Sequence, residues 1–286
     1  MLFNILEQSF LFFPLALGLY ISYAVLRIPD LTTDGSFVLG AALFGVSIHL
    51  NIHPVLSMGI ATFGGALCGA AVSFLQTRFH LHPLIAGILL VFILNTLSLK
   101  LMGRPNLSLL DRPSIFSLID PSKLLLLFSL TFTLLISAAF LLTSKTGVLL
   151  HALGNNPTLL NLFGKNANAY RMLGLCISNG LVGFSGALTA QANGYVDTSM
   201  GLGVVLIALG TVMIGQQIYQ FLFANLPLKN ILRLLSCLTG IFAYFFLINI
   251  LISAGLDPIY LRLMIGLSLI GFLAITRNKK LQETRS

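Results

Sequence analysis

Charged residues are scarce in this chain and tryptophan is absent. Of the 286 residues only 8% are Asp, Glu, Lys or Arg, whereas 57% are hydrophobic, and the mean hydropathy is +0.96. A soluble domain needs far more charge on its surface than this composition supplies. The scarcity of charge therefore excludes an ordinary soluble protein.

Sequence signatures of catalysis and metal binding are also missing. The three cysteines, Cys68, Cys176 and Cys237, stand singly in apolar runs, which is typical of packing residues. His49 and His53 have no carboxylate or Cys nearby, so we expect no metal site. No nucleophile motif, paired catalytic carboxylates or phosphate-binding GxxxxGK loop occurs. We expect no cofactor in this chain, and an enzyme, including a lipid-modifying one, is disfavoured.

Long apolar runs make up most of the chain. A helix needs about 20 apolar residues to cross a bilayer, so the runs predict an all-α polytopic membrane protein with about nine transmembrane helices. Strands of a membrane barrel would alternate apolar and polar residues, whereas these runs are apolar on every face. We expect a single transmembrane domain over 1–286, with runs at 9–28, 36–50, 54–77, 83–101, 122–143, 172–192, 201–223, 231–254 and 259–276.

The distribution of Lys and Arg predicts the orientation. Basic residues in short loops stay on the cytoplasmic side, which would hold the segment 144–171 and the C-terminus. An odd number of spans then places the N-terminus outside. The net charge of +8 is a topology signal and gives no support to a nucleic-acid partner. The cytoplasmic set is Arg78, Lys145, Lys165, Arg171, Lys229, Arg233, Arg277, Lys279, Lys280 and Arg285, and the opposite set is Lys100, Arg104, Arg112, Lys123 and Arg262.

A short pattern occurs twice. The segments 34–40 (DGSFVLG) and 197–203 (DTSMGLG) share Asp, Ser, Leu and Gly, and each opens an apolar run. In the predicted topology the first run heads outward and the second inward, so the copies form an inverted repeat with broken helices. Such repeats often place a solute path near the membrane midplane. The polar residues of the repeat, Asp34, Ser36, Asp197 and Ser199, would either cap helices or line that path.

Other polar groups within the apolar runs are sparse. Asn95, Asn179 and Gln191 need partners in hydrocarbon, so they would bond between helices or line the same path. Apart from Asp34, we expect no Asp, Glu, Lys or Arg buried near the centre of a run. A proton-coupled carrier normally needs such residues, which disfavours an autonomous secondary carrier or channel.

Two polar segments could meet soluble partners. The stretch 144–171 is a basic, Asn-rich interruption that the topology places in the cytosol, whereas 102–121 is the longest external loop. The external loop could be a docking surface or a plain connector.

The motifs of the second half carry a family resemblance. They are 151–157 (HALGNNP) with Gly164, 178–181 (SNGL) with 186–188 (GAL), and 200–203 (MGLG) with Gly215. Together they resemble the inner-membrane permease family of bacterial ABC importers, among which the branched-chain amino acid and ribose-type permeases are the most similar. The likeness covers about 5–275 of the chain.

The resemblance implies that the HALGNNP segment forms a coupling helix in a cleft of an ATP-binding subunit. The helix would run from Pro157 to Gly164, beginning at Asn155 or Asn156. The chain departs from the family at His151, where Arg is usual, and its 158–160 stretch (TLL) replaces a more Ala-rich one. An ordinary polar loop is the alternative to this role. The implied coupling residues are His151, Gly154, Asn155, Asn156, Pro157, Leu160 and Gly164.

The resemblance also implies a function. The chain would be the permease subunit of an ATP-driven importer in the bacterial inner membrane, paired with a second permease subunit of like or unlike sequence. A partner subunit would use the ATP, and an external solute-binding protein would deliver the solute. Few charges favour a zwitterionic or neutral solute, and the family likeness favours a hydrophobic or aromatic amino acid over a sugar or nucleoside.

Overall fold

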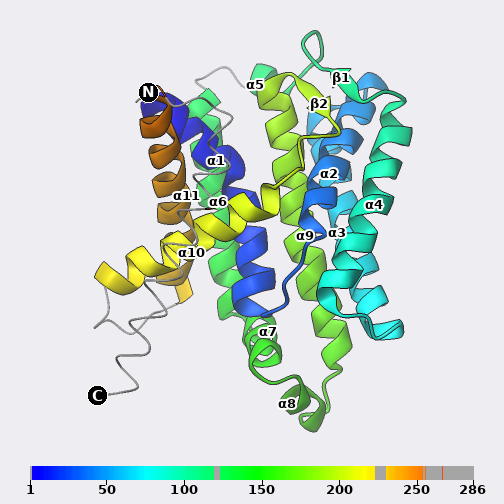
Figure 1. Cartoon of the computed structure of the whole chain (residues 1–286), viewed down its shortest axis with the longest axis vertical. Helices are drawn as coiled ribbons and strands as arrows, with labels where there is room; N and C mark the ends of the chain where they lie inside the picture. Colours follow the sequence, from blue (N-terminus) through cyan, green and yellow to red (C-terminus); the bar gives the residue numbers. More distant parts are fainter. Residues whose placement is uncertain (1, 119–122, 223–229, 254, 256–265, 267–286) are drawn as a thin grey trace.

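The structure is a computed structural model that describes residues 2–118, 123–222, 230–253, 255 and 266, and it is almost entirely helical (Figure 1). Helix α1 (Leu2–Leu19) continues through a π-helical segment, η1 (Tyr20–Val25). Two short strands, β1 (Asn106–Ser108) and β2 (Tyr195–Asp197), pair antiparallel. The other helices are α2 (Thr33–His49), α3 (Pro54–Arg78), α4 (Pro83–Met102), α5 (Ile115–Leu118), α6 (Lys123–Thr143), α7 (Lys145–Asn155), α8 (Pro157–Leu162), α9 (Ala167–Asn193), α10 (Val204–Leu222) and α11 (Asn230–Ser253).

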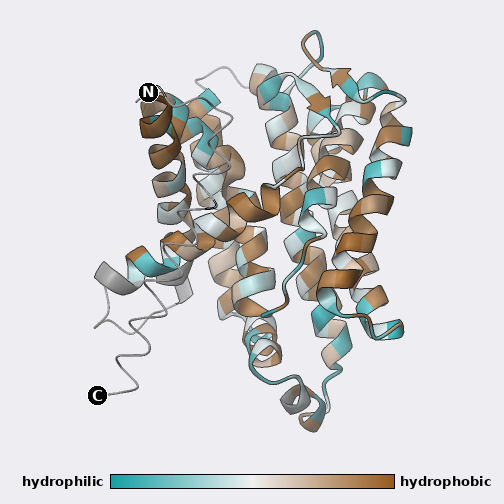
Figure 2. Cartoon of the chain, in the orientation of Figure 1, coloured by the Kyte–Doolittle hydropathy of each residue, from teal (hydrophilic) through white to brown (hydrophobic). Residues whose placement is uncertain are grey.

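The predicted class, an all-α polytopic membrane protein, is confirmed. Among the described residues, six helical segments are long and apolar enough to cross a membrane, and hydrophilic residues gather toward the two ends of the bundle (Figure 2). Helices α2 and α10 are shorter, and the predicted run 259–276 lies outside the described residues apart from Gly266. The number of nine spans therefore stays a prediction. The six segments are Leu2–Val25, Pro54–Arg78, Pro83–Met102, Lys123–Thr143, Ala167–Asn193 and Leu234–Ser253.

The two ends of the bundle differ. The β1–β2 pair lies at one end, here called the β end, where α1 also begins, and α8 lies at the opposite end, here called the α8 end (Figure 1). The strands join two connections far apart in sequence, with Leu107 opposite Val196. The start of α1 and the α7–α8 segment therefore lie at opposite ends.

The short helices α2 and α10 begin inside the bundle. After η1 the chain returns as an extended segment, 26–32, and α2 starts part-way up and runs toward the β end, whereas α10 runs away from it (Figure 1). Pro29 disfavours helical backbone at the residue before it, and Gly203, with φ +82°, precedes α10 in a conformation that favours glycine. The repeated segments differ in structure: Asp34 lies in the first turn of α2, but Asp197 lies in β2. The inverted repeat stays a prediction.

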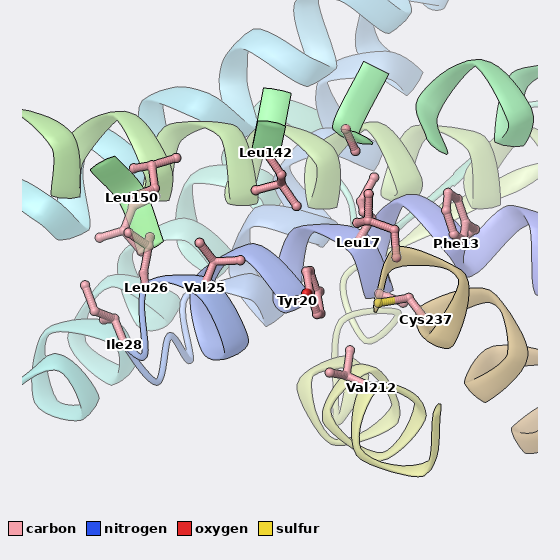
Figure 3. Packing of buried hydrophobic residues seen from close by; sticks show 14 of the residues in the cluster. Phe13, Leu17, Tyr20, Val25, Leu26, Ile28, Leu142, Leu150, Val212 and Cys237 are labelled. Atoms are coloured by element: carbon pink, nitrogen blue, oxygen red, sulfur yellow. The ribbon is translucent and has the colours of Figure 1, made fainter. Parts of the chain in front are cut away.

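Helix α9 lies at the centre and packs against α1, α2 and α3 through small residues. The Ser178 hydroxyl donates a hydrogen bond to the Gly18 carbonyl at 2.7 Å, and a Cβ on Gly40 would lie 2.5 Å from the Gly183 Cα. Such close backbone contact is how membrane helices gain packing energy without a hydrophobic driving force. Helix α1 also packs against α11, and Figure 3 shows part of their shared hydrophobic cluster, with Leu17 and Cys237.

This packing predicts different effects for two glycines of α3. A Cβ on Gly65 would lie 2.3 Å from the Asn179 carbonyl oxygen, whereas a Cβ on Gly59 would meet nothing within 4 Å. Gly65→Val should therefore destabilise the protein by about 2 to 3 kcal/mol, and Gly59→Val should change stability by less than about 0.5 kcal/mol. Thermal unfolding of the detergent-solubilised protein measures both. Equal unfolding temperatures for the two variants would contradict the close α3–α9 contact.

Candidate functional site

Asp34 connects the two interrupted helices. It lies in the first turn of α2, and its carboxylate accepts a hydrogen bond from the backbone N–H of Val205, at the start of α10, at 2.8 Å. The first N–H groups of a helix lack partners within the helix, and a negative charge there also complements the helix dipole. Asp34 therefore acts as a cap, as its residue type predicted, but for α10 and not for its own helix.

A second carboxylate lies in the extended segment before α2. Asp30 is 2% exposed, and its carboxylate accepts hydrogen bonds from the Thr32 backbone N–H at 2.9 Å and from Asn179 Nδ2 at 2.7 Å. The Asn179 carboxamide oxygen in turn accepts a hydrogen bond from the Ser36 hydroxyl at 2.7 Å. We call Asp30, Asn179 and Ser36 the central network. It links the extended segment, α9 and α2 in a place closed to solvent.

Asp30 is a buried acidic residue that the sequence patterns did not single out, because it lies between two apolar runs and not within one, whereas Asp34 is half-buried. The sequence places Asp30 just past the end of an apolar run, where a surface turn is the usual reading. The sequence signal for the role of Asp30 was its place after Pro29 in a non-helical stretch. Asp in such a stretch commonly accepts a hydrogen bond from the backbone N–H two residues on, which here belongs to Thr32. The Thr32 hydroxyl is buried without a partner in the described part of the chain.

A groove lies between α4 and the turn before α10. Asn95, Thr96 and Leu99 of α4 and Thr198, Ser199 and Leu202 of the turn line a pocket of about 350 Å³. Thr96 also lines a second pocket of about 480 Å³, with Phe92, Ile93, Leu97 and Lys100. Since the two pockets share Thr96, they form one surface along α4, which we call the α4 groove.

Asp197 lies in β2 next to the α4 groove. Its carboxylate accepts hydrogen bonds from the hydroxyl and the backbone N–H of Ser199 and, at 3.1 Å, from Asn106 Nδ2. These bonds to Ser199 and Asn106 hold the pKa of Asp197 below its ordinary value, so the carboxylate is ionised at neutral pH. Asp197 belongs to the β end and not to the central network.

Gln191, predicted with the same group, lies elsewhere. Its carboxamide oxygen accepts a hydrogen bond from the Ile115 N–H at 2.9 Å, and its Nε2 donates to the Ala187 carbonyl at 3.3 Å. Gln191 therefore links α9 to α5. The other predicted path residues fall into two groups. Ser36 is bonded to Asn179, and Asp34 lies near them in the first turn of α2. Asn95 and Ser199 both line the α4 groove, and Asp197 is bonded to Ser199.

The polar segment 144–171 folds as the hairpin of α7 and α8. The Asn156 side chain accepts a hydrogen bond from the Thr158 N–H at 3.0 Å, so it caps α8, whereas Asn155 is the last residue of α7. Gly164, with φ +67°, follows α8, and the Lys165 N–H bonds to the Leu160 carbonyl at 2.9 Å. The short helix that the family likeness implied after Asn156 is present, as α8 (Pro157–Leu162).

The hairpin presents different residues to the bundle and to solvent. Leu160 is 1% exposed, and a Cβ on Gly154 would lie 2.1 Å from the Val25 carbonyl oxygen of η1, so both face the bundle. His151 is half-buried, and Asn155, Asn156, Pro157 and Gly164 are exposed. Leu162 and Phe163, which were not among the predicted residues, are 81% and 76% exposed. The sequence signal for this exposed pair was its position directly before Gly164, the glycine that follows α8.

Metal binding has no structural support in the part of the chain described. No group of three or more His, Cys, Asp or Glu side chains there could hold a metal ion.

The chain is similar to known permeases over nearly its whole length. Residues 1–273 match the family described as "Branched-chain amino acid transport system / permease component". The chain belongs to this family. It is 41% identical over 281 residues to the uncharacterized protein RP368 of Rickettsia prowazekii (strain Madrid E), covering 98% of each chain. It is 30% identical over 272 residues to the tyrosine transport system permease protein of Clostridioides difficile (strain R20291), covering 95% of this chain and 90% of that one. No solved structure matches it significantly.

The family fits the fold. With its apolar helices, the chain is a multi-pass inner-membrane permease, the transport subunit of an ABC transporter for a small solute.

The central network predicts that Asn179 matters more than other amides in the bundle. Asn179→Ala removes a donor from buried Asp30 and an acceptor from Ser36, which should cost about 3 kcal/mol. Asn249→Ala is the control, because within the described part of the chain the Asn249 amide donates to the Phe245 carbonyl of its own helix at 2.9 Å, so about 1 kcal/mol is expected. Thermal unfolding in detergent compares the two. A loss at Asn179 no larger than that at Asn249 would contradict the network.

Proposed function

We propose that this chain is the permease subunit of an ABC importer, working as a dimer with a second permease subunit of like or unlike sequence. An ATP-binding subunit docks at the α8 end, and an extracytoplasmic solute-binding protein docks at the β end. The exposed α7–α8 hairpin carries this proposal, because it lies at the α8 end of the bundle (Figure 1) and exposes the apolar side chains of Leu162 and Phe163. ATP is used by the partner, and no cofactor is assigned to this chain.

The hairpin has the composition of a docking surface. Exposed Leu162 and Phe163 form an apolar tip, and segment 144–171 contains Lys145, Lys165 and Arg171 but no Asp or Glu. Apolar anchors with a charged rim are typical of binding hot spots. We therefore expect the ATP-binding subunit to present an apolar cleft with an acidic rim. The exposed residues Asn155, Asn156, Pro157 and Gly164 would lie at its edge, with His151, Gly154 and Leu160 supporting the hairpin from beneath.

Contacts connect the hairpin to the central network. Gly154 of α7 packs on the Val25 carbonyl, and the side chains of Leu26 and Leu150 both meet α9 at Gly174 (Figure 3 shows Leu26 and Leu150). The extended segment that holds Asp30 begins directly after η1. Movement of the hairpin as the ATP-binding subunits close would therefore shift this segment, and with it the start of α2.

The orientation follows from the same proposal. If the hairpin meets the ATP-binding subunit, the α8 end and the C-terminus are cytoplasmic, and the N-terminus and the β end are external. The basic residues Arg78, Lys145, Lys165 and Arg171 then lie on the cytoplasmic side, as the distribution of charge favours. The opposite directions of α2 and α10 support an inverted repeat that surrounds the solute path.

We propose an amino acid as the solute, of hydrophobic or aromatic type. The relative described as a tyrosine transport permease supports this class, as does the low charge of the spans. A sugar or nucleoside is the alternative solute. An autonomous carrier could use Asp30 and Asp34 as proton sites, but each carboxylate is already engaged as a hydrogen-bond acceptor that joins two segments of the bundle.

Removing the apolar tip of the hairpin tests the docking. Leu162→Ser combined with Phe163→Ser should weaken co-purification with the ATP-binding subunit at least about tenfold, because buried apolar anchors are lost. Leu110→Ser is the control, since Leu110 is 79% exposed and follows β1 by two residues, at the β end. Leu160 is unsuitable for this test because it is buried, so its replacement would perturb folding. Unchanged association of the double variant would overturn the docking.

Transport itself is tested in proteoliposomes that contain the complete complex and its binding protein. Labelled amino acids, sugars and nucleosides are offered with and without ATP. We expect ATP-dependent accumulation of an amino acid. Accumulation without ATP would favour the carrier, and uptake of only a sugar or nucleoside would exclude the proposed solute.

A further inference from the structure

An apolar groove lies between α1, α6 and α11. Its volume is about 450 Å³, and every residue that lines it is Leu or Phe except Thr131, whose hydroxyl is buried. Helix α1 forms its floor with buried Phe10, whereas Phe128 and Phe132 of α6 and Leu235 of α11 are exposed along its walls. Since water is unfavourable against such a surface, the groove requires an apolar occupant. We call it the α1–α6–α11 groove.

Aromatic rings from the three helices meet at the groove. The Phe10 ring centroid lies 5.9 Å from that of Phe128 and 5.8 Å from that of Phe242, and both pairs are edge-to-face. Phe128 also stacks on Phe132, with the ring centroids 6.3 Å apart. Such pairs have preferred geometries, so they fix the spacing of the helices that border the groove.

The groove has the length of one membrane leaflet. Its lining residues Leu124 and Leu135 are eleven positions apart on α6, which is about 16 Å along a helix. The hydrocarbon core of a bilayer is about 30 Å thick, so one leaflet supplies about 15 Å. Lys123, the first residue of α6, pairs with Glu7 near the start of α1, so the groove begins at the β end. One acyl chain of the leaflet at that end matches its length.

The ion pair of Lys123 and Glu7 lies beside the β end of the groove. The two residues directly neighbour the lining residues Leu124 and Leu6 in sequence, and their salt bridge joins α6 to α1. The Lys123 ammonium also lies 5.1 Å from the centroid of the Phe116 ring. Both charged side chains are partly exposed, so each can take a further hydrogen-bond partner from the membrane surface. The groove thus has a cation and an anion side by side at one end.

We propose that the α1–α6–α11 groove binds a phosphatidylethanolamine, a phospholipid with a zwitterionic headgroup. One acyl chain lies in the groove, the lipid phosphate pairs with Lys123, and the lipid ammonium donates to the Glu7 carboxylate. A lone lysine would favour an anionic lipid, but the neighbouring Glu7 offsets its charge. A choline headgroup has no N–H to donate to Glu7. The site goes beyond the proposed function, because it depends on neither the solute nor the ATP-binding subunit.

The absence of tryptophan from the chain allows a direct test by fluorescence. Phe132→Trp places a single fluorophore on the groove wall, and Phe63→Trp on α3 is the matched control. Both phenylalanines are more than half exposed and lie nine positions after the first residue of their helix, but Phe63 does not line the groove.

The full-length chain is placed in vesicles of equal parts phosphatidylethanolamine, phosphatidylcholine and phosphatidylglycerol. One lipid at a time carries bromine on its acyl chains, which quenches a tryptophan in contact with it. Brominated phosphatidylethanolamine should quench Phe132→Trp at least about twofold more strongly than either other lipid, because two charge-assisted contacts retain it. The three lipids should quench Phe63→Trp equally.

Variants of the ion pair test the headgroup contacts. Glu7→Gln combined with Lys123→Met should abolish the preference in the Phe132→Trp background, since both contacts are lost. Glu7→Lys combined with Lys123→Glu rebuilds the pair in reversed order and should recover most of the preference. Unchanged quenching of Phe63→Trp in each background shows that the bundle is still folded in the membrane.

Three results would overturn the assignment. They are equal quenching of Phe132→Trp by the three lipids, a preference for phosphatidylglycerol, and a preference that survives the loss of both charges. Protection of Phe132→Trp from every brominated lipid, with normal quenching of Phe63→Trp, would also overturn it, because protein would then cover the groove, as a second permease subunit could. All of these results would leave the proposed importer unaffected.

Discussion

Helices that begin inside a membrane must have their first N–H groups satisfied without bulk water, and this requirement shapes the centre of the protein. Asp34 satisfies it for α10 from the neighbouring helix α2, and Asp30 accepts from Asn179 and from the backbone of its own segment. Asp34 of α2 thus accepts from the start of α10, and Asp30 of segment 26–32 accepts from Asn179 of α9. The start of α2, the start of α10 and α9 are therefore positioned together, and a displacement of one breaks hydrogen bonds of the others.

The arrangement places three surfaces around one centre. The α4 groove opens beside the helix starts, the β1–β2 pair closes the β end, and the α7–α8 hairpin protrudes from the opposite end (Figure 1). Close contacts of α7 with η1 join the hairpin to the segment that holds Asp30. The proposed importer needs such a continuous connection, because binding of the ATP-binding subunit at one end has to change the solute path in the middle.

Much of the fold could be predicted from local patterns, whereas tertiary pairings could not. Apolar runs gave the long helices because burial in lipid depends on composition, and Asn156 and Gly164 indicated the short helix α8 because caps act locally. Asp30 was missed because its burial depends on segment 26–32 folding back between helices. The cross-helix cap by Asp34 was equally hidden, since nothing in the sequence pairs it with Val205. Leu162 and Phe163 were overlooked because exposure of an apolar pair is known only once the hairpin is placed.

We propose that the interrupted helices border a water-accessible path, and thiol accessibility in a variant lacking the three native cysteines tests this. Ser36 is buried in the central network and is unsuitable, but Ser199 is exposed in the α4 groove. The account predicts that Ser199→Cys reacts with a membrane-impermeant thiol reagent added from outside, whereas Thr133→Cys on α6 does not. Reaction at neither position, or equal reaction at both, would contradict it.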